Sequence, residues 1–118
     1  MKEVIAVLRM NKIQQTKDAL AEAGYTCLTA NLVYGRGKQK GLYINPLGNI
    51  TPDSKRAAIR FLPKRMLTLV VDDASVSPVV ELIMQTNRTG MIGDGRIFVC
   101  PMTDAVRVRT GEQGNDAL

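Results

Sequence analysis

The fold is decided by one segment, Lys2-Glu3-Val4-Ile5-Ala6-Val7-Leu8-Arg9, which is apolar through its centre. Successive side chains of an extended chain point to opposite faces, and here the even and the odd positions both carry aliphatic residues. A strand with two apolar faces is buried from both sides. The segment 64–72 repeats this pattern around Met66-Leu67-Thr68-Leu69-Val70-Val71, so we expect a second strand of the same kind there.

Two helices are expected beside these strands. Asn11 can cap a helix that runs to Gly24, where a glycine is a suitable C-terminal stop. A second helix follows the second apolar strand, and Pro78 is tolerated in its first turn. The stripes expected to face the core are Ile13, Thr16, Leu20 and Ala23 on the first helix, and Val76, Val79, Val80, Ile83 and Met84 on the second.

Further extended segments complete the order of elements. Residues 25–35 are rich in Thr, Val, Leu and Tyr, and residues 96–100 form another candidate strand. Between 36 and 60, five glycine or proline residues and many charges interrupt any period, which predicts a long flexible loop. We therefore expect one α+β domain over 1–118, a ferredoxin-like βαββαβ sandwich followed by a C-terminal segment at 101–118.

This architecture leaves one face of the sheet uncovered. Two helices can cover only one face of a four-stranded sheet, although two of the expected strands are apolar on both faces. A monomer would expose that second face as a large apolar patch. We therefore expect the chain to assemble into a symmetric oligomer that buries it.

Composition excludes several classes of function. The 118 residues include no histidine, and the two cysteines, Cys27 and Cys100, stand far apart, so zinc sites and histidine-based catalysis are disfavoured. Sixteen Lys and Arg against eleven Asp and Glu give a net charge of +5, which suits anionic ligands. Aromatic residues make up only 4%, too few for a base-stacking platform, so nucleic acid is not an expected partner. Neither a signal-peptide pattern nor a membrane-length apolar run is visible, which predicts a cytoplasmic protein that is not embedded in a membrane.

A candidate phosphate site lies in the stretch Thr89-Gly90-Met91-Ile92-Gly93-Asp94-Gly95-Arg96-Ile97-Phe98-Val99. Its glycines free backbone N–H groups to turn toward an anion, and Arg96 adds charge beside them. Arg107 and Arg109 are two apart in a segment expected to be extended, so their side chains emerge on one side. Taken singly, the glycine run is more often a tight turn and the arginine pair a solvated strand face. Together they supply enough donors for a polyphosphate.

These motifs, with Gly35-x-Gly37-Lys38-Gln39-Lys40-Gly41 and Phe61-Leu62-Pro63-Lys64 in the same order, resemble the PII family of nitrogen-regulatory signalling proteins. The resemblance covers nearly the whole chain, and it implies a trimer whose sheets line the inside. It also implies ATP or ADP held in a cleft between subunits, with Thr29 near the base. The residues implied for nucleotide binding are Thr29, Gly35, Lys38, Gly93, Asp94, Gly95, Arg96, Arg107 and Arg109.

The resemblance implies a second effector, 2-oxoglutarate, bound together with Mg²⁺. The residues implied for 2-oxoglutarate are Gln39, Lys40, Gly41 and Lys64. Gln39 is also the residue implied for magnesium, a hard cation that prefers oxygen ligands. Without the flanking motifs, Gln39 would be interpreted as an ordinary polar loop residue and Lys64 as a charged residue at a strand edge.

The sequence departs from the commonest family pattern in its loop and at two other positions. The loop is longer, and Tyr43 stands too early to take the place of the tyrosine that is uridylylated in the enterobacterial type. Thr68 stands where many members carry a glutamate that faces the nucleotide, and Met91 replaces a basic residue. The start of the chain and the block from Gly35 to Gly41 look closest to the nitrogenase-associated PII subclass.

The resemblance implies a regulatory binding protein, not an enzyme, that senses nitrogen status and acts on a partner through the long loop. Nitrogenase is the expected target, and in the nitrogenase-associated subclass a paralogous PII subunit acts together with the first. One alternative is a PII regulator of an ammonium transporter or another enzyme of nitrogen metabolism. An alternative of another class is a small nucleotide-hydrolysing enzyme, which would lack an evident base because Thr68 stands where a carboxylate might have served.

Overall fold

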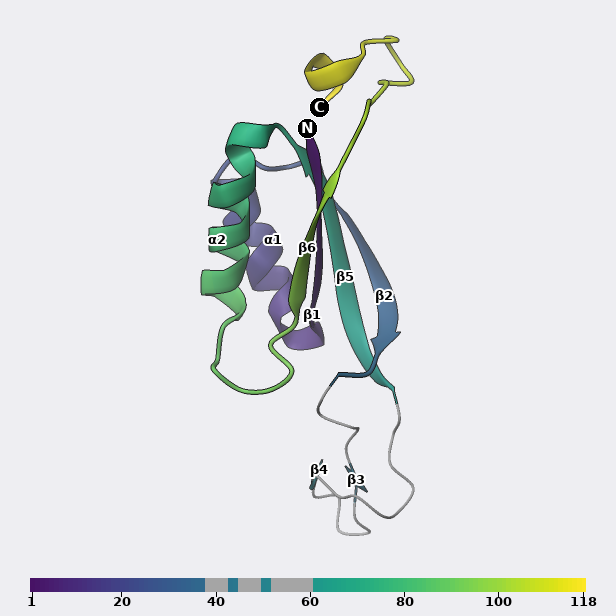
Figure 1. Cartoon of the computed structure of the whole chain (residues 1–118). Coiled ribbons are helices and arrows are strands. Elements are labelled where there is room, and N and C mark those ends of the chain that lie inside the picture. The colour runs from purple at the N-terminus through teal and green to yellow at the C-terminus, as the bar shows by residue number, and fades with distance from the viewer. Residues whose placement is uncertain (38–42, 45–49, 52–60) are drawn as a thin grey trace.

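A computed structural model describes residues 1–37, 43–44, 50–51 and 61–118. Four strands form one antiparallel sheet in the order β2-β5-β1-β6. The two helices lie together on one side of this sheet (Figure 1). The bounds of the sheet strands and helices are β1 Lys2–Arg9, α1 Ile13–Glu22, β2 Thr29–Gly35, β5 Leu62–Val71, α2 Val76–Asn87 and β6 Arg96–Pro101. This arrangement confirms the α+β ferredoxin-like fold expected from the sequence.

The core lies between the sheet and the helices. β1 is central, and its Val4 stands opposite Leu69 of β5 and Val99 of β6. The even positions of β1 are buried against the helices, as their alternation predicts. The buried apolar residues of the core are Val4, Ala6, Leu8, Leu20, Leu67, Leu69, Val71, Val79 and Ile83.

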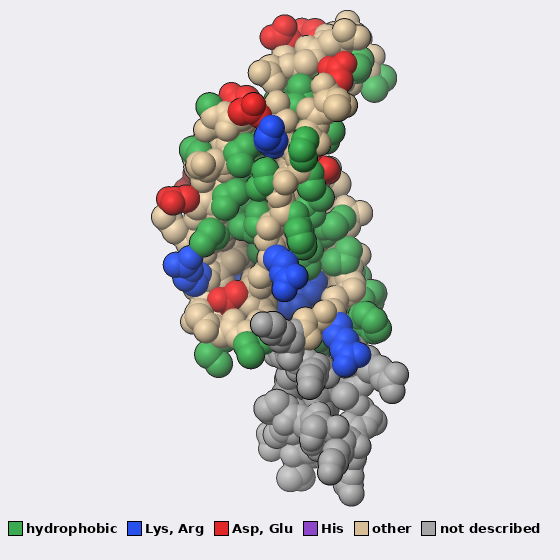
Figure 2. Space-filling view, viewed as in Figure 1, with side chains coloured by type: hydrophobic (Ala, Val, Ile, Leu, Met, Phe, Trp, Pro, Cys, Tyr) green, Lys and Arg blue, Asp and Glu red, His purple; other side chains and the backbone are tan. Residues whose placement is uncertain are grey.

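The opposite face of the sheet has no helix over it (Figure 1). The odd positions of β1 point to this side, where Ile5 stands opposite Thr68 of β5 and Phe98 of β6. Phe98 keeps 47% of its surface exposed. Figure 2 shows hydrophobic side chains gathered along this part of the molecule. One uncovered apolar face is therefore present, as expected, and the trimer that would bury it stays a prediction.

The first helix begins differently from the expectation. Met10–Lys12 form a 3-10 turn directly after β1, and α1 starts at Ile13 without a side-chain cap. Asn11 lies inside that turn, so its predicted capping role is wrong. The Thr16 hydroxyl donates a hydrogen bond to the Lys12 carbonyl, one helical turn earlier, at 2.8 Å.

The end of the same helix was predicted well. Gly24 has a φ of +92°, and its N–H donates to the Ala21 carbonyl at 3.0 Å. A left-handed glycine of this kind is a common helix stop. Because the helix ends at Glu22, Ala23 lies outside it and is exposed, and the prediction that Ala23 joins the buried stripe is wrong. On α2 the buried positions Val79 and Ile83 follow the expected stripe, whereas Met84 is 39% exposed.

The long loop contains more order than expected where it is described. Strand β3 (Tyr43–Ile44) pairs antiparallel with β4 (Ile50–Thr51), and Ile44 stands opposite Ile50. The sequence shows no sustained period here because two residues are too few to establish one. Four predicted ligand residues, Lys38, Gln39, Lys40 and Gly41, lie outside the described residues. Within the described ranges, no helix has the length and apolar character needed to cross a membrane.

Candidate functional site

The glycine loop, residues 88–95, joins α2 to β6 and depends on its glycines. Gly90, Gly93 and Gly95 have φ values of +81°, +102° and +114°. A Cβ on Gly95 would lie 2.1 Å from the carbonyl oxygen of Val7 in β1, which is far inside van der Waals contact. Only glycine therefore lets the loop turn and return this closely along β1.

Asp94 holds the glycine loop together from within. Its carboxylate accepts hydrogen bonds from the N–H of Thr89 at 2.8 Å and of Gly90 at 3.0 Å. It also accepts from the Thr89 hydroxyl and pairs with the guanidinium of Arg9. The Thr89 hydroxyl and N–H, then Arg9 and the Gly90 N–H, hold the pKa of Asp94 well below its ordinary value. Asp94 was predicted to bind nucleotide; its contacts in this structure are with the loop itself.

Arg9 is a site residue that the sequence did not indicate. Besides its contact with Asp94, its Nη2 donates to the carbonyl of Ile92 at 3.0 Å. Its Nη1 also lies 3.4 Å from the Thr89 hydroxyl. An arginine at the end of a strand is ordinarily solvated, and its partners here are more than 79 positions away in the sequence. The signal that could have found it is the register, because Arg9 stands opposite Lys64, a predicted site residue.

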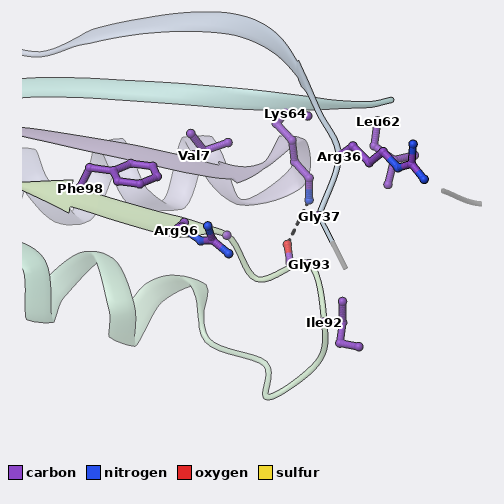
Figure 3. A pocket seen from close by; sticks show the side chains of 11 residues that line it. Val7, Arg36, Gly37, Leu62, Lys64, Ile92, Gly93, Arg96 and Phe98 are labelled. Carbon is purple, nitrogen blue, oxygen red and sulfur yellow. Dashed lines mark hydrogen bonds between the residues drawn. The ribbon is translucent and has the colours of Figure 1, made fainter. Parts of the chain in front are cut away.

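Lys64 contacts the loop from the other side. Its ammonium donates to the carbonyl of Gly93 at 3.0 Å (Figure 3). Burial lowers the pKa of Lys64, and the neighbouring positive charge of Arg9 lowers it further, against the opposing effect of Asp94. The ammonium is thus partly desolvated and next to another cation, so an anion arriving at this point would be stabilised.

A pocket of about 370 Å³ brings three separated motifs together. It lies at the end of the sheet that leads into the long loop, and Figure 3 shows the side chains of Arg36, Lys64 and Arg96 around it. Three positively charged side chains, beside apolar residues such as Val7 and Phe98, suit an anion that carries several negative charges. The residues that line it are Val7, Gly35, Arg36, Gly37, Leu62, Lys64, Ile92, Gly93, Gly95, Arg96 and Phe98.

The C-terminal arginines lie elsewhere in the chain. The segment after β6 sits at the opposite end of the sheet from the glycine loop (Figure 1). Arg107 pairs with Glu112, and its Nη2 donates to the carbonyl of Leu118 at 3.2 Å. The carbonyl of Arg107 accepts the N–H of Gly111 at 2.7 Å, so Arg109 lies in a turn and is exposed.

That geometry tests two expectations about where these arginines lie. The expectation of an extended segment at Arg107 and Arg109 is wrong, because Thr110 and Gly111 allow the chain to turn back within a few residues. Within one chain, neither arginine is among the residues that line the pocket at the glycine loop. Thr29, the first residue of β2, stands opposite Thr68 and is not among the residues lining the pocket. The pocket that one chain forms therefore includes none of these three residues.

The family described as "Nitrogen regulatory protein P-II" matches residues 1–112 of this chain. The chain belongs to that family. Because the match spans residues 1–112, the predicted resemblance to PII is confirmed over nearly the whole length. Members of this family are regulatory proteins.

Named relatives agree with this assignment. "Nitrogen fixation nifHD region GlnB-like protein 2" of Methanobacterium ivanovii is 51% identical over 121 residues, covering 100% of this chain and 99% of the relative. The protein of the same name from Methanococcus maripaludis is 47% identical over 123 residues, with 100% of both chains covered. "Nitrogen regulatory protein P-II 2" of Methanothermobacter thermautotrophicus is 40% identical over 118 residues, covering 100% of this chain and 97% of the relative.

The part of this P-II chain that the structure describes contains no group of three or more His, Cys, Asp or Glu residues that could hold a metal ion. A magnesium ion in the pocket would therefore take most of its oxygen ligands from bound phosphates and water, a common arrangement for this cation. The cationic lining fits the phosphates of such a complex, and the predicted amide ligand, Gln39, lies outside the described residues.

Proposed function

We propose that this P-II protein binds ATP and ADP in the pocket at the glycine loop. The observation that carries the proposal is that Gly35, Lys64, Gly93, Gly95 and Arg96, separated by up to 61 positions in the sequence, line one cationic pocket. A polyphosphate brings the several negative charges that Arg36, Lys64 and Arg96 require. Family membership supports the same ligand class.

The site is completed by the adjoining subunit of a trimer in this proposal. Arg107, Arg109 and Thr29 do not line the pocket within one chain, but the uncovered sheet face gives the chains a surface on which to assemble. The C-terminal segment projects beyond the sheet, and its Val108 is fully exposed. An exposed apolar residue in a projecting segment supports packing against a neighbour, which would carry both arginines to a second chain.

2-Oxoglutarate and Mg²⁺ bind next to the phosphates in this proposal. The magnesium ion neutralises phosphate charge, and the Gln39 amide oxygen is a ligand of the type it prefers. Lys64, with a lowered pKa and a place in the pocket lining, can neutralise a carboxylate. Gln39 stands near the start of the 36–60 loop and Lys64 follows its end, so occupancy changes which loop conformations are populated, provided that the effectors bind those conformations unequally.

The regulated partner in this proposal is nitrogenase, contacted through the 36–60 loop. The names of the most similar relatives place them in a nitrogen-fixation gene region, which supports this target. A paralogous P-II subunit is the expected co-assembling chain, and the pull-down described next tests for it as well. A pull-down from nitrogen-starved cells is expected to retain nitrogenase; retention of an ammonium transporter instead would contradict the proposed target.

Calorimetry tests the effector sites. We expect ATP to bind the native protein, and 2-oxoglutarate to bind only when ATP and Mg²⁺ are present. Gln39→Ala is expected to abolish 2-oxoglutarate binding and to keep most of the affinity for ATP. The matched control is Gln85→Ala, which removes the same amide from an exposed position on α2. Unchanged 2-oxoglutarate affinity in Gln39→Ala would overturn the assignment.

A further inference from the structure

We infer that Arg9 is a positioning residue that fixes the glycine loop in the shape required for phosphate binding. This inference rests on the proposed nucleotide site and adds a residue to it that does not line the pocket. Arg9 reaches three groups of the loop, the Thr89 hydroxyl, the Asp94 carboxylate and the Ile92 carbonyl. It therefore ties both ends of the 89–94 turn to the last residue of a central strand.

The contacts of Arg9 determine how the peptide groups of the loop point. The peptide bond between Ile92 and Gly93 is trans, so the carbonyl of Ile92 and the N–H of Gly93 point in opposite directions. Arg9 holds that carbonyl at 3.0 Å, and Arg9 lies outside the pocket lining while Gly93 lies in it. The Ile92 carbonyl oxygen, which would repel a phosphate, therefore points to the Arg9 guanidinium outside the pocket lining. The N–H of Gly93 points in the opposite direction.

The geometry requires the forked guanidinium and not charge alone. A guanidinium offers several donors in one plane, whereas an ammonium is a single point of charge. Arg9 uses Nη1 on Asp94 and Nη2 on Ile92. The side chains of Arg9 and Asp94 are only 24% and 26% exposed, so the pair is less screened than an ordinary surface ion pair.

Lys64 is the matching contact on the pocket side. It stands opposite Arg9 in the β1–β5 register and holds the next carbonyl, that of Gly93. An anion that draws the Lys64 ammonium away would release the Gly93 carbonyl, whereas the Ile92 carbonyl and Asp94 would stay held by Arg9. Arg9 thus preserves the shape of the loop while Lys64 exchanges partners.

The test compares Arg9→Lys and Arg9→Gln with Arg88→Gln. Arg88 is exposed and lies just before the 89–94 turn that Arg9 contacts, so its variant is a control for loss of positive charge nearby. Affinities for ATP and for adenosine are measured by calorimetry, with folding checked by circular dichroism. We expect Arg9→Lys, which keeps the charge, to bind ATP about tenfold more weakly, the loss of one charge-assisted hydrogen bond. Adenosine affinity is expected to stay unchanged in all variants. Native ATP affinity in Arg9→Lys would overturn the inference.

A second readout needs no nucleotide and separates this inference from the proposed function. Hydrogen exchange of the Thr89 and Gly90 amides, which donate to Asp94, is expected to accelerate about tenfold in Arg9→Lys and to stay native in Arg88→Gln. If the native protein binds no ATP, the proposed function fails while this exchange still tests the role of Arg9 in shaping the loop. Native exchange rates in Arg9→Lys would overturn it.

A double variant distinguishes positioning from general destabilisation. Asp94→Asn breaks the same contact from the other partner with little change of shape. Because the two substitutions share the Arg9–Asp94 contact, the loss of ATP affinity in Arg9→Lys with Asp94→Asn is expected to be smaller than the sum of the two single losses. Fully additive losses would show independent effects and would contradict the inference.

Discussion

Gly95 is the residue where backbone freedom and close approach coincide. A Cβ there would meet the Val7 carbonyl at 2.1 Å, whereas a Cβ on Gly24, with a similar positive φ, would meet nothing within 4 Å. We expect Gly24→Ala to cost about 1 kcal/mol of unfolding free energy, the ordinary penalty of a left-handed residue. Gly95→Ala is expected to cost at least about 2 kcal/mol, because backbone must also move. Urea denaturation measures both, and equal losses would show that the close approach is not limiting.

Asp94 determines how the glycine loop responds to acid. The pKa of Asp94 is lower in the folded chain than the ordinary value of 3.8. Its contacts therefore stabilise the folded chain at pH values above 3.8. This stability is lost only as the pH falls through the lowered pKa. We expect the amide NMR signals of Thr89 and Gly90 to stay constant from pH 7 down to about pH 4. A titration midpoint of these signals at or above 3.8 would contradict the Asp94 contacts.

At the scale of elements, one buried polar contact ties the two helices together. The Asn87 amide at the end of α2 donates to the Thr16 hydroxyl of α1 at 2.9 Å and to the Ile83 carbonyl at 2.8 Å. Both side chains are buried, with 4% and 1% of their surfaces exposed. Thr16→Val keeps the shape and removes the acceptor, so we expect a loss of about 1–3 kcal/mol in chemical denaturation. A loss below about 0.5 kcal/mol would mean that the contact adds little.

The regular elements were predictable because their patterns are local. The apolar alternation of 2–9 and the stripe of α2 follow from neighbouring residues, and the structure has both. Gly24 marked the end of the first helix for the same reason. The start of that helix was not predictable in this way, because a 3-10 turn after β1 displaced Asn11 from the capping position.

The candidate site was predictable only in part. Glycine spacing and charge indicated Gly93, Gly95 and Arg96, and family motifs indicated Gly35 and Lys64, all of which line the pocket. Asp94, indicated with them, accepts hydrogen bonds from the loop instead. Arg9 escaped notice because its partners are distant in sequence and meet it only once the sheet forms. The turn at Arg107 was not predicted, because a pattern of alternating residues indicates a strand even where the chain turns back a few residues later.

At the scale of the whole molecule, the uncovered face of the sheet is the surface that the proposed trimer would bury. Ile5 lies on that face, whereas Tyr34, which is 66% exposed, lies on the face that carries the helices. Ile5→Lys is expected to convert a trimer into monomers, because a charge would be buried in the interface. Tyr34→Lys is the control and should leave the trimer intact. Light scattering of the native protein and both variants decides this, and a native monomer or an Ile5→Lys trimer would contradict the assembly.

The central claim is that one subunit supplies the glycine loop and its neighbour supplies the C-terminal arginines. Mixing two defective chains tests it directly. One chain carries Arg96→Glu beside the glycine loop, and the other carries Arg107→Ala with Arg109→Ala. We expect each variant alone to lose ATP binding.

Co-assembled trimers, verified by native mass spectrometry, are then titrated with ATP in a calorimeter. Some interfaces of the mixed trimer join an intact loop from one chain to intact arginines from the other, so the account predicts that ATP binding returns at a fraction of the sites. Mixed trimers that remain unable to bind ATP would contradict it.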